Sequence, residues 1–301
     1  MTSGAGAPPR VLLVGGGGGL VGRAVLRELA PSFRIRSVHR SPVPAEAAAG
    51  VEWVPGDVAF VRDFDPLLEG VDAIVNLAWY RWESPQRFRA LYEGLSRLLE
   101  ASARHGSVRI VHVSVPAAPT NLETGLPYLT YKRRLDRELA ASGLSYRILR
   151  PTLLFGPGDR LLTVMLRLMA TYHLFPMFGD GRYHVSPLAT ADLARVVRQE
   201  IEGTGNGTVD LGGPERWVYR DLTDRMFSAL RRTPRYVGMG ERTALFVARL
   251  VVGAGSKLIY PYEVEWLMSD LLGLPAYRGL ATPLEEVGPF LDRIANQQAQ
   301  V

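Results

Sequence analysis

The sequence predicts an α/β protein, in which a doubly wound parallel sheet is followed by a smaller, mostly helical C-terminal region. Short apolar runs alternate with amphipathic stretches of helical spacing through the first two thirds of the chain. This rhythm is typical of a parallel sheet with helices on both faces. A run of five glycines separates the first apolar run from the first helical stretch, and a tight turn between a buried strand and a helix needs glycine.

The predicted strands are segments with the β-rich, near-continuous apolar character of a sheet that is buried on both faces. They are RVLLV (10–14), FRIRSV (33–38), VEWV (51–54), DAIVNLA (72–78), VRIVHVS (108–114), LSYRIL (144–149) and TVDLGG (208–213).

We expect three parts in the chain. Residues 1–10, MTSGAGAPPR, have no basic start followed by an apolar core, so they are predicted to be a disordered tail and not a secretion signal. Residues 11–159 and about 181–213 form the predicted nucleotide-binding domain. Periodicity weakens in residues 160–180 and 214–301, which are rich in Pro, Trp and Tyr and are assigned to a substrate or partner region.

Composition excludes several classes of function. The chain has no cysteine, and its five histidines show no ligand spacing, so no metal site is expected. The net charge is +5, but the arginines are scattered without interleaved aromatic residues, and nucleic acid is not an expected partner. No heptad seam is visible, which leaves the oligomeric state open.

No uncharged apolar stretch approaches the roughly 18 residues that a membrane span requires, so a cytoplasmic location is predicted. Residues 243–260, TALFVARLVVGAGSKLIY, are apolar enough to lie on a bilayer or on a partner protein. A peripheral position at the inner face of the membrane therefore stays open. The alternative is an ordinary core helix.

The glycine run is the first candidate binding motif. In VLLVGGGGGLVGRAVLREL, the glycines Gly16, Gly19 and Gly22 fit the pattern GxxGxxG. Glycine permits the tight turn and lets the backbone approach a diphosphate, whose charge then lies at a helix N-terminus. Leu20 and Val21 at the start of this helix belong to the same predicted site, and a merely flexible loop is the alternative.

The end of the second strand predicts which cofactor is preferred. A carboxylate at this place would bind the adenosine 2′-hydroxyl and repel a 2′-phosphate. This strand ends in His39 and Arg40, with no carboxylate. A guanidinium suits a phosphate, so NADP(H) is preferred and NAD(H) stays an alternative. Arg40 as one more solvated arginine is the competing interpretation.

A second adenosine contact is predicted after the third strand. Asp57, in the turn PGDV with Val58 behind it, is placed to accept a hydrogen bond from an adenine amino group. A simple turn aspartate is nearly as good an interpretation.

One lysine suggests proton chemistry. Of the 35 basic residues, only Lys132 and Lys257 are lysines, so the presence of lysine and not arginine at position 132 needs an explanation. In YLTYKRRLDRELAASG, Tyr128 lies one helical turn before Lys132 and shares its face. A nearby ammonium favours a phenolate, which makes the phenol a usable acid or base. The alternative is a surface ion pair of Lys132 with Asp136 and a core aromatic at Tyr128.

Several motifs together resemble one family. The glycine run, DAIVNLAW, HVS, YLTYK, LRPTLLFGPGD and GDGRYHVSPLATADLA are similar to the extended or atypical branch of the short-chain dehydrogenase/reductase superfamily, over about residues 11–213. This branch includes proteins of the NAD-dependent epimerase/dehydratase type. The segment LPAYRGLATPLEEVGPFLDRI resembles the C-terminal segment of the nucleotide-binding accessory subunit of complex I and its bacterial relatives.

The resemblance implies a Rossmann-type sheet that holds NADPH, with Tyr128 delivering a proton to a substrate carbonyl or alkoxide. It also implies that Ala78 and Trp79, at the end of the fourth strand, lie beside the cofactor. Pro151 and Thr152 should border the nicotinamide.

Two positions depart from the family pattern. Ser114 is the first serine of the turn after strand five, but Val115 and Pro116 follow where a catalytic hydroxyl is usual. Ser114 is therefore only a candidate catalytic residue, and the alternative is a strand-end hydroxyl that satisfies the local backbone. Leu91 occupies the place of the family's helix asparagine, which argues against a proton relay through that helix.

Two functions follow from these patterns. The first is an NADP(H)-dependent oxidoreductase or epimerase that acts on a small carbonyl or alcohol with Tyr128 and Lys132. The second is a catalytically weak or inert NADPH-binding accessory protein of a membrane-associated complex. The substrate is not identified by the sequence, because the irregular C-terminal region sets it.

Overall fold

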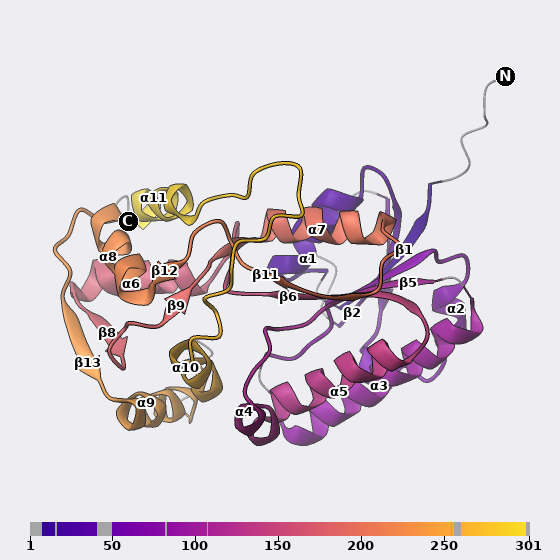
Figure 1. Cartoon of the computed structure of the whole chain (residues 1–301), viewed down its shortest axis with the longest axis horizontal. Coiled ribbons are helices and arrows are strands. Elements are labelled where there is room, and N and C mark those ends of the chain that lie inside the picture. Colours follow the sequence, from indigo (N-terminus) through magenta and orange to yellow (C-terminus); the bar gives the residue numbers. More distant parts are fainter. Residues whose placement is uncertain are drawn as a thin grey trace. The chain divides into compact units, whose positions relative to one another are not determined.

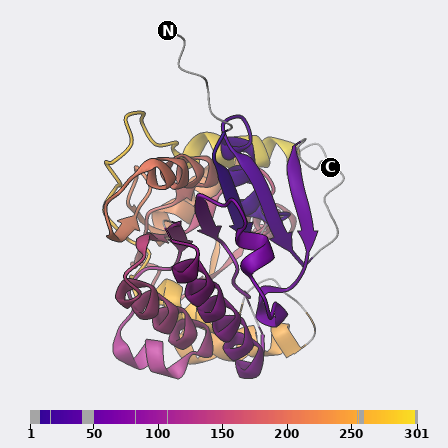
Figure 2. The same cartoon turned by 90° about the vertical axis from the view of Figure 1, so that its right-hand side faces the viewer.

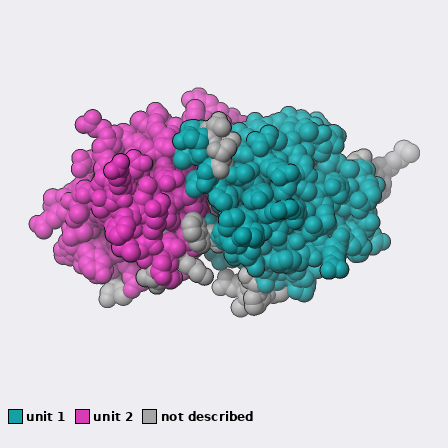
Figure 3. All heavy atoms as spheres, turned by 90° about the horizontal axis from the view of Figure 1, so that it is seen from below, with its two compact units in different colours: residues 1–150, 193–209 teal, residues 151–192, 210–301 magenta. Residues whose placement is uncertain are grey.

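The computed structural model describes residues 8–15, 17–40, 50–81, 83–106, 108–253, 255 and 260–298. The chain divides into two compact units (Figure 3), one with residues 1–150 and 193–209 and the other with residues 151–192 and 210–301. Residues 151–159, which the sequence assigns to the nucleotide-binding domain, lie in the second unit. There β7 (Leu154–Phe155) pairs with β10 (Leu188–Ala189).

The predicted fold class is confirmed by a seven-stranded sheet in the order β11-β6-β5-β4-β1-β2-β3 (Figures 1 and 2). The pairs from β3 to β6 are parallel. The strands are β1 (Arg10–Val14), β2 (Arg34–His39), β3 (Val51–Pro55), β4 (Ala73–Asn76), β5 (Arg109–Val113), β6 (Ser145–Pro151) and β11 (Gly207–Leu211).

Helices cover both faces of this sheet, with α1 and α7 on one side and α3 and α5 on the other (Figure 1). The first unit's helical elements are α1 (Leu20–Leu29), η1 (Val58–Phe60), α2 (Asp65–Leu68), α3 (Pro85–Arg104), α4 (Thr120–Gly125) and α5 (Pro127–Ala141), while α7 (Thr190–Glu202) lies largely in this unit. The sheet needs cover on both faces because β1 and β4 are buried throughout, apart from the partly exposed Arg10.

Helix α5 has local reasons for both of its ends. Pro127 occupies its first turn, where the missing amide hydrogen has no partner to lose. The helix ends at Ala141, and Gly143 follows with φ +75°, a conformation that favours glycine after a helix. Its buried face includes Leu135 and Leu139, at 2% and 1% exposure.

Helix α3 packs unusually close to η1. A side-chain carbon added to Gly94 of α3 would overlap the carbonyl of Val58 and approach within 2.9 Å of Ala59 Cα. Only glycine fits at this crossing without a backbone shift.

The second unit is built from helices around short strand pairs. Its core gathers side chains of α6 (Leu161–Tyr172), α8 (Tyr219–Ala229) and α11 (Val287–Gln298), including Leu166, Phe227 and Leu291. The remaining elements are β8 (Phe175–Phe178), β9 (His184–Val185), β12 (Trp217–Val218), β13 (Tyr236–Met239), α9 (Glu241–Gly253) and α10 (Pro261–Met268).

The apolar segment 243–260 forms part of α9 up to Gly253. Ala244 and Ala248 are buried, whereas Phe246 and Leu250 are 61% and 57% exposed. One side of α9 thus packs in the core, whereas the other exposes two large apolar side chains. Within the described parts of the chain, no helix combines the length and the apolar character needed to cross a membrane.

Candidate functional site

The turn between β1 and α1 depends on two glycines that the GxxGxxG pattern does not single out. Gly15 has φ +72° and donates its amide to Val38 O at 3.0 Å, and a Cβ there would lie 2.5 Å from Ala78 Cα. A Cβ on Gly17 would lie 2.9 Å from Ser37 Oγ and from the Trp53 ring. The predicted Gly16 lies outside the described residues.

Helix α1 offers free backbone donors to an anion. It begins at Leu20 and Val21 after Gly19, which has an extended backbone with φ −81°. No described side chain caps its first amides, and no acidic residue lies in its first turn. Gly22 is buried within the helix. These features suit the diphosphate of a dinucleotide, because the helix N-terminus attracts negative charge.

The end of β2 presents one guanidinium and one buried imidazole. His39 is buried with its ring edge-on to Trp53, at 5.1 Å between centroids. Arg40 is half exposed, lies 4.5 Å from the centre of the Tyr80 ring and 4.0 Å from Asp57 Oδ2. This cation–π contact with the Tyr80 ring holds the Arg40 guanidinium at the end of β2.

Asp57 serves the local structure in the way a turn aspartate does. Its carboxylate accepts from Ala59 N at 3.1 Å, which caps η1 just before the buried Val58. It also accepts from Tyr80 Oη at 3.0 Å and lies 3.5 Å from Arg87. Its contact with adenine stays a prediction, and no sequence pattern indicated Tyr80 or Arg87 as its neighbours.

The side chains of Tyr128 and Lys132 both lie beside the indole ring of Trp79. The Lys132 ammonium lies 4.6 Å from the centre of the Trp79 ring. The Tyr128 ring is edge-on to Trp79 at 6.2 Å and to Phe88 at 6.0 Å. The structure therefore brings the two predicted residues of α5 together with a third from the end of β4.

Burial controls the charge of Lys132, which is only 4% exposed. The pKa of Lys132 is lowered to about 7, chiefly by desolvation; the charge of Asp136 opposes this lowering and the charge of Arg133 adds to it. The surface ion pair with Asp136, which the sequence left open, is not formed, because both residues are buried.

Ser114 belongs to a buried polar cluster. Its hydroxyl donates to Asp136 Oδ2 at 2.9 Å, and the residue is 3% exposed. Arg133 also binds Asp136 Oδ2 at 2.7 Å, while Arg150 lies 3.4 Å away. The Ser114 hydroxyl thus binds a carboxylate of α5 and not the local backbone that the alternative interpretation named, and a catalytic role for Ser114 stays a prediction.

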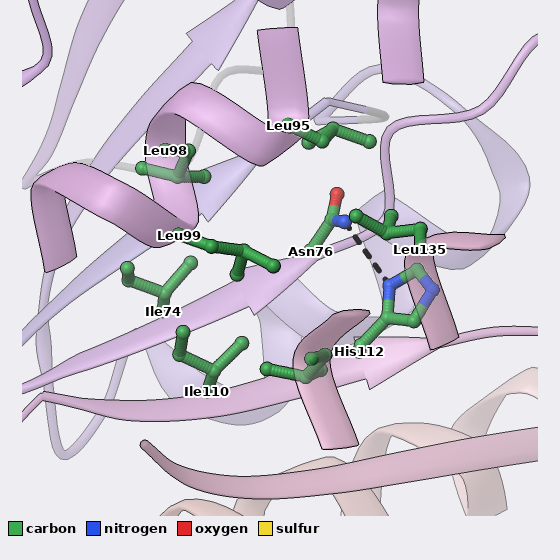
Figure 4. Close-up of a pocket in the computed structure, with 9 residues that line it drawn as sticks. Ile74, Asn76, Leu95, Leu98, Leu99, Ile110, His112 and Leu135 are labelled. Carbon is green, nitrogen blue, oxygen red and sulfur yellow. Dashed lines mark hydrogen bonds between the residues drawn. The ribbon is translucent and has the colours of Figure 1, made fainter. Parts of the chain in front are cut away.

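The cluster continues to the end of β4 through His112 (Figure 4). Asn76 Oδ1 accepts from Ala78 N at 3.0 Å, so its Nδ2 donates to His112 Nδ1, also at 3.0 Å. The proton of the neutral imidazole then lies on Nε2, 3.3 Å from Asp136 Oδ1. Burial lowers the pKa of His112, although Asp136 opposes this. A small interior cavity, otherwise lined by leucine and isoleucine, lies beside Asn76 and His112.

Pro151 and Thr152 are buried in the second unit. Thr152 donates its amide to Leu211 O at 3.1 Å and its hydroxyl to Ser186 O at 2.5 Å. Their position beside a nicotinamide stays a prediction.

The residues present fit a dinucleotide on structural grounds. The glycine turn would be filled by any Cβ at positions 15 or 17, and the amides of α1 have no side-chain cap. The described residues contain no cluster that could hold a metal ion.

Residues 16–165 match a family model described as NAD(P)H-binding. This part of the chain is thus an NAD(P)H-binding domain, and the resemblance to the epimerase/dehydratase type of short-chain dehydrogenase/reductase is confirmed at the level of the fold. A nucleoside-diphosphate-sugar epimerase structure from Staphylococcus aureus superimposes with TM-score 0.76 at 17% identity, over 93% of this chain and 99% of that one.

Curated relatives are similar over different shares of the chain. A 2-alkyl-3-oxoalkanoate reductase of Stenotrophomonas maltophilia is 27% identical over 73% of this chain and 75% of its own. A ceramide reductase of Caulobacter vibrioides is 30% identical over 64% and 62%. Subunit 9 of the NADH dehydrogenase alpha subcomplex from Arabidopsis thaliana is 25% identical, over 46% of this chain and 35% of that protein.

Proposed function

We propose that this protein is an NADP(H)-dependent reductase that acts on a carbonyl group in a substrate with a long alkyl chain. The observation that carries the proposal is the meeting of Tyr128 and Lys132 at Trp79 within the NAD(P)H-binding unit. The alkyl chain is suggested by two relatives, whose names describe reductases of a 2-alkyl-3-oxoalkanoate and of ceramide.

The proposed chemistry needs one proton and one hydride. The reduced nicotinamide, when bound, supplies the hydride. Tyr128 donates its phenolic proton to the carbonyl oxygen, and the adjacent Lys132 ammonium stabilises the phenolate that remains. The ammonium also suits the ribose hydroxyls as a compact, rotatable donor. Trp79 and Phe88 pack edge-on against the Tyr128 ring, which is partly buried.

Arg40 carries the proposed preference for NADP(H). We expect the native protein to bind NADPH about tenfold or more tightly than NADH, because a guanidinium pairs strongly with a 2′-phosphate. Arg40→Ala should remove most of this preference and leave the affinity for NADH within about threefold. Calorimetric titration with each cofactor measures both affinities.

A matched control is Arg89→Ala, which removes an arginine of α3 that pairs with Glu93 at 2.7 Å. This variant should keep the native preference. Equal affinities of the native protein for NADPH and NADH would refute the 2′-phosphate assignment.

A second candidate function is an inert NADPH-binding accessory protein of a membrane-associated complex, located at the cytoplasmic face of the membrane. Two observations favour it: the Ser114 hydroxyl is bound to Asp136, and part of the chain is similar to the plant complex I subunit. The exposed side of α9 then supplies the contact, since Phe246 and Leu250 lie with the exposed Arg242 and Arg249.

This second candidate predicts vesicle binding. We expect the native protein to sediment with vesicles that contain anionic lipid, and the double variant Phe246→Ser, Leu250→Ser to lose about tenfold in affinity, because two large apolar side chains leave the interface. The control Phe60→Ser alters an aromatic residue of the first unit that is 63% exposed. If all three proteins sedimented equally, the exposed side of α9 would be excluded as the membrane contact.

A further inference from the structure

Asp136 is a buried charge with several polar neighbours near the candidate site. It is 3% exposed, and its carboxylate contacts Ser114, His112, Arg133 and Arg150. Although burial alone would raise the pKa of Asp136, His112, Arg133 and Ser114 hold it well below its usual range. The group is thus an ionised carboxylate throughout the physiological range of pH.

The carboxylate also belongs to the helix that carries the candidate catalytic pair. Asp136 lies one helical turn after Lys132, which itself lies one turn after Tyr128, so all three side chains share a face of α5. Lys132 and Asp136 are both buried on this face, at 4% and 3% exposure.

Two further connections lead from Asp136 to the strand ends. His112 and Asn76 link it to the Ala78 amide, which lies next to Gly15 and Trp79. Arg133 binds the carbonyl groups of Val115 and Pro116 in the turn after β5. The network thus fixes α5 against the ends of both β4 and β5.

We propose that Asp136 is a positioning residue, which acts through this buried network to hold Lys132 against Trp79 and to keep its amine charged. The role of Lys132 in catalysis and cofactor binding is taken from the proposed function, and the rest of the proposal does not depend on that function. A purely mechanical anchor would also fix the helix, but it would not alter the proton affinity of Lys132. The groups near Lys132 are Asp136, Arg133 and Tyr128 on its own helix, His112 from β5 and the Trp79 ring.

The chain permits a direct test, because Lys132 and Lys257 are its only lysines. The full-length protein labelled with 13C at lysine Cε should give two lysine signals, and Lys257→Arg identifies the one from Lys132. We expect Asp136→Asn to lower the titration midpoint of Lys132 by about one pH unit or more, since the opposing negative charge is lost. Asp136→Glu keeps the charge and should keep a midpoint close to the native one.

Loss of a buried partner of Arg133 can unfold the protein, so circular dichroism must show that the variant is folded. The double variant Arg133→Gln, Asp136→Asn removes both charges together, which is milder. The midpoint should still fall, but by less, because Asp136 acts on Lys132 more strongly than Arg133 does.

An unchanged midpoint in a folded variant of either kind would overturn the proposal. A lowered midpoint should be accompanied by weaker NADPH binding at pH 8 if Lys132 serves the cofactor. If the midpoint falls while NADPH binding is unaltered, the positioning role stands and the proposed function of Lys132 fails.

Discussion

Replacement of Tyr128 by phenylalanine should reduce turnover by about a thousandfold, within the range expected for loss of a positioned general acid. The variant loses only the phenolic hydroxyl and keeps the ring that packs edge-on against Trp79 and Phe88. Its affinity for NADPH should therefore stay within about threefold of the native value. The measurement is NADPH oxidation with 3-oxoacyl compounds of increasing chain length, together with calorimetric binding of NADPH.

A suitable control is Tyr131→Phe on the same helix, since Tyr131 packs against Tyr92 at 5.8 Å and away from Trp79. This variant should retain native turnover. Turnover by Tyr128→Phe at the native rate would exclude Tyr128 as the proton donor. Tight NADPH binding by a native protein that turns over none of these compounds would favour the accessory function.

Binding of NADPH should weaken as pH rises above 7, and this slope should depend on Lys132. Burial lowers the pKa of Lys132 to about 7 in the free protein, whereas the proposed complex uses the ammonium form. Binding then takes up one proton, so affinity is fully present below about pH 7 and falls by up to tenfold per pH unit above it. Calorimetry between about pH 6.5 and 9 measures this dependence.

The cofactor does not produce this slope by itself, because a phosphate monoester with a second pKa near 6 is already a dianion above pH 7. Lys132→Met should bind weakly with a nearly flat profile, and Lys257→Arg should retain the native slope. An equal slope in Lys132→Met and in the native protein would assign the proton to another group.

Much of the fold was predictable because a sheet buried on both faces imposes apolar strands, and the glycine run marks where the first strand turns into a helix. The face shared by Tyr128 and Lys132 followed from helical spacing alone. The particular glycines did not, because Gly15 and Gly17 are distinguished by their close approach to Ala78 and Trp53 in the folded chain. A run of five identical glycines does not indicate which of them makes a close contact.

The buried polar network around Asp136 could also not be predicted from the sequence. The run KRRLDRE has the composition of a solvated helix face, yet Lys132, Arg133 and Asp136 within it are all buried. Their burial depends on His112 and Ser114, which lie about twenty residues earlier in the chain, and on Arg150, which follows α5. Such a cluster becomes visible only when strands and helix are assembled.

The tight crossing of α3 over η1 makes the adenosine end of the proposed site sensitive to a residue that never touches it. A methyl group at position 94 would displace the carbonyl of Val58, the residue next to Asp57. Because Asp57 also anchors Tyr80, on which the Arg40 guanidinium rests, the displacement would reach the group that is proposed to choose between the two dinucleotides. If Arg40 makes the proposed contact, cofactor choice would then depend partly on the spacing of α3 and η1.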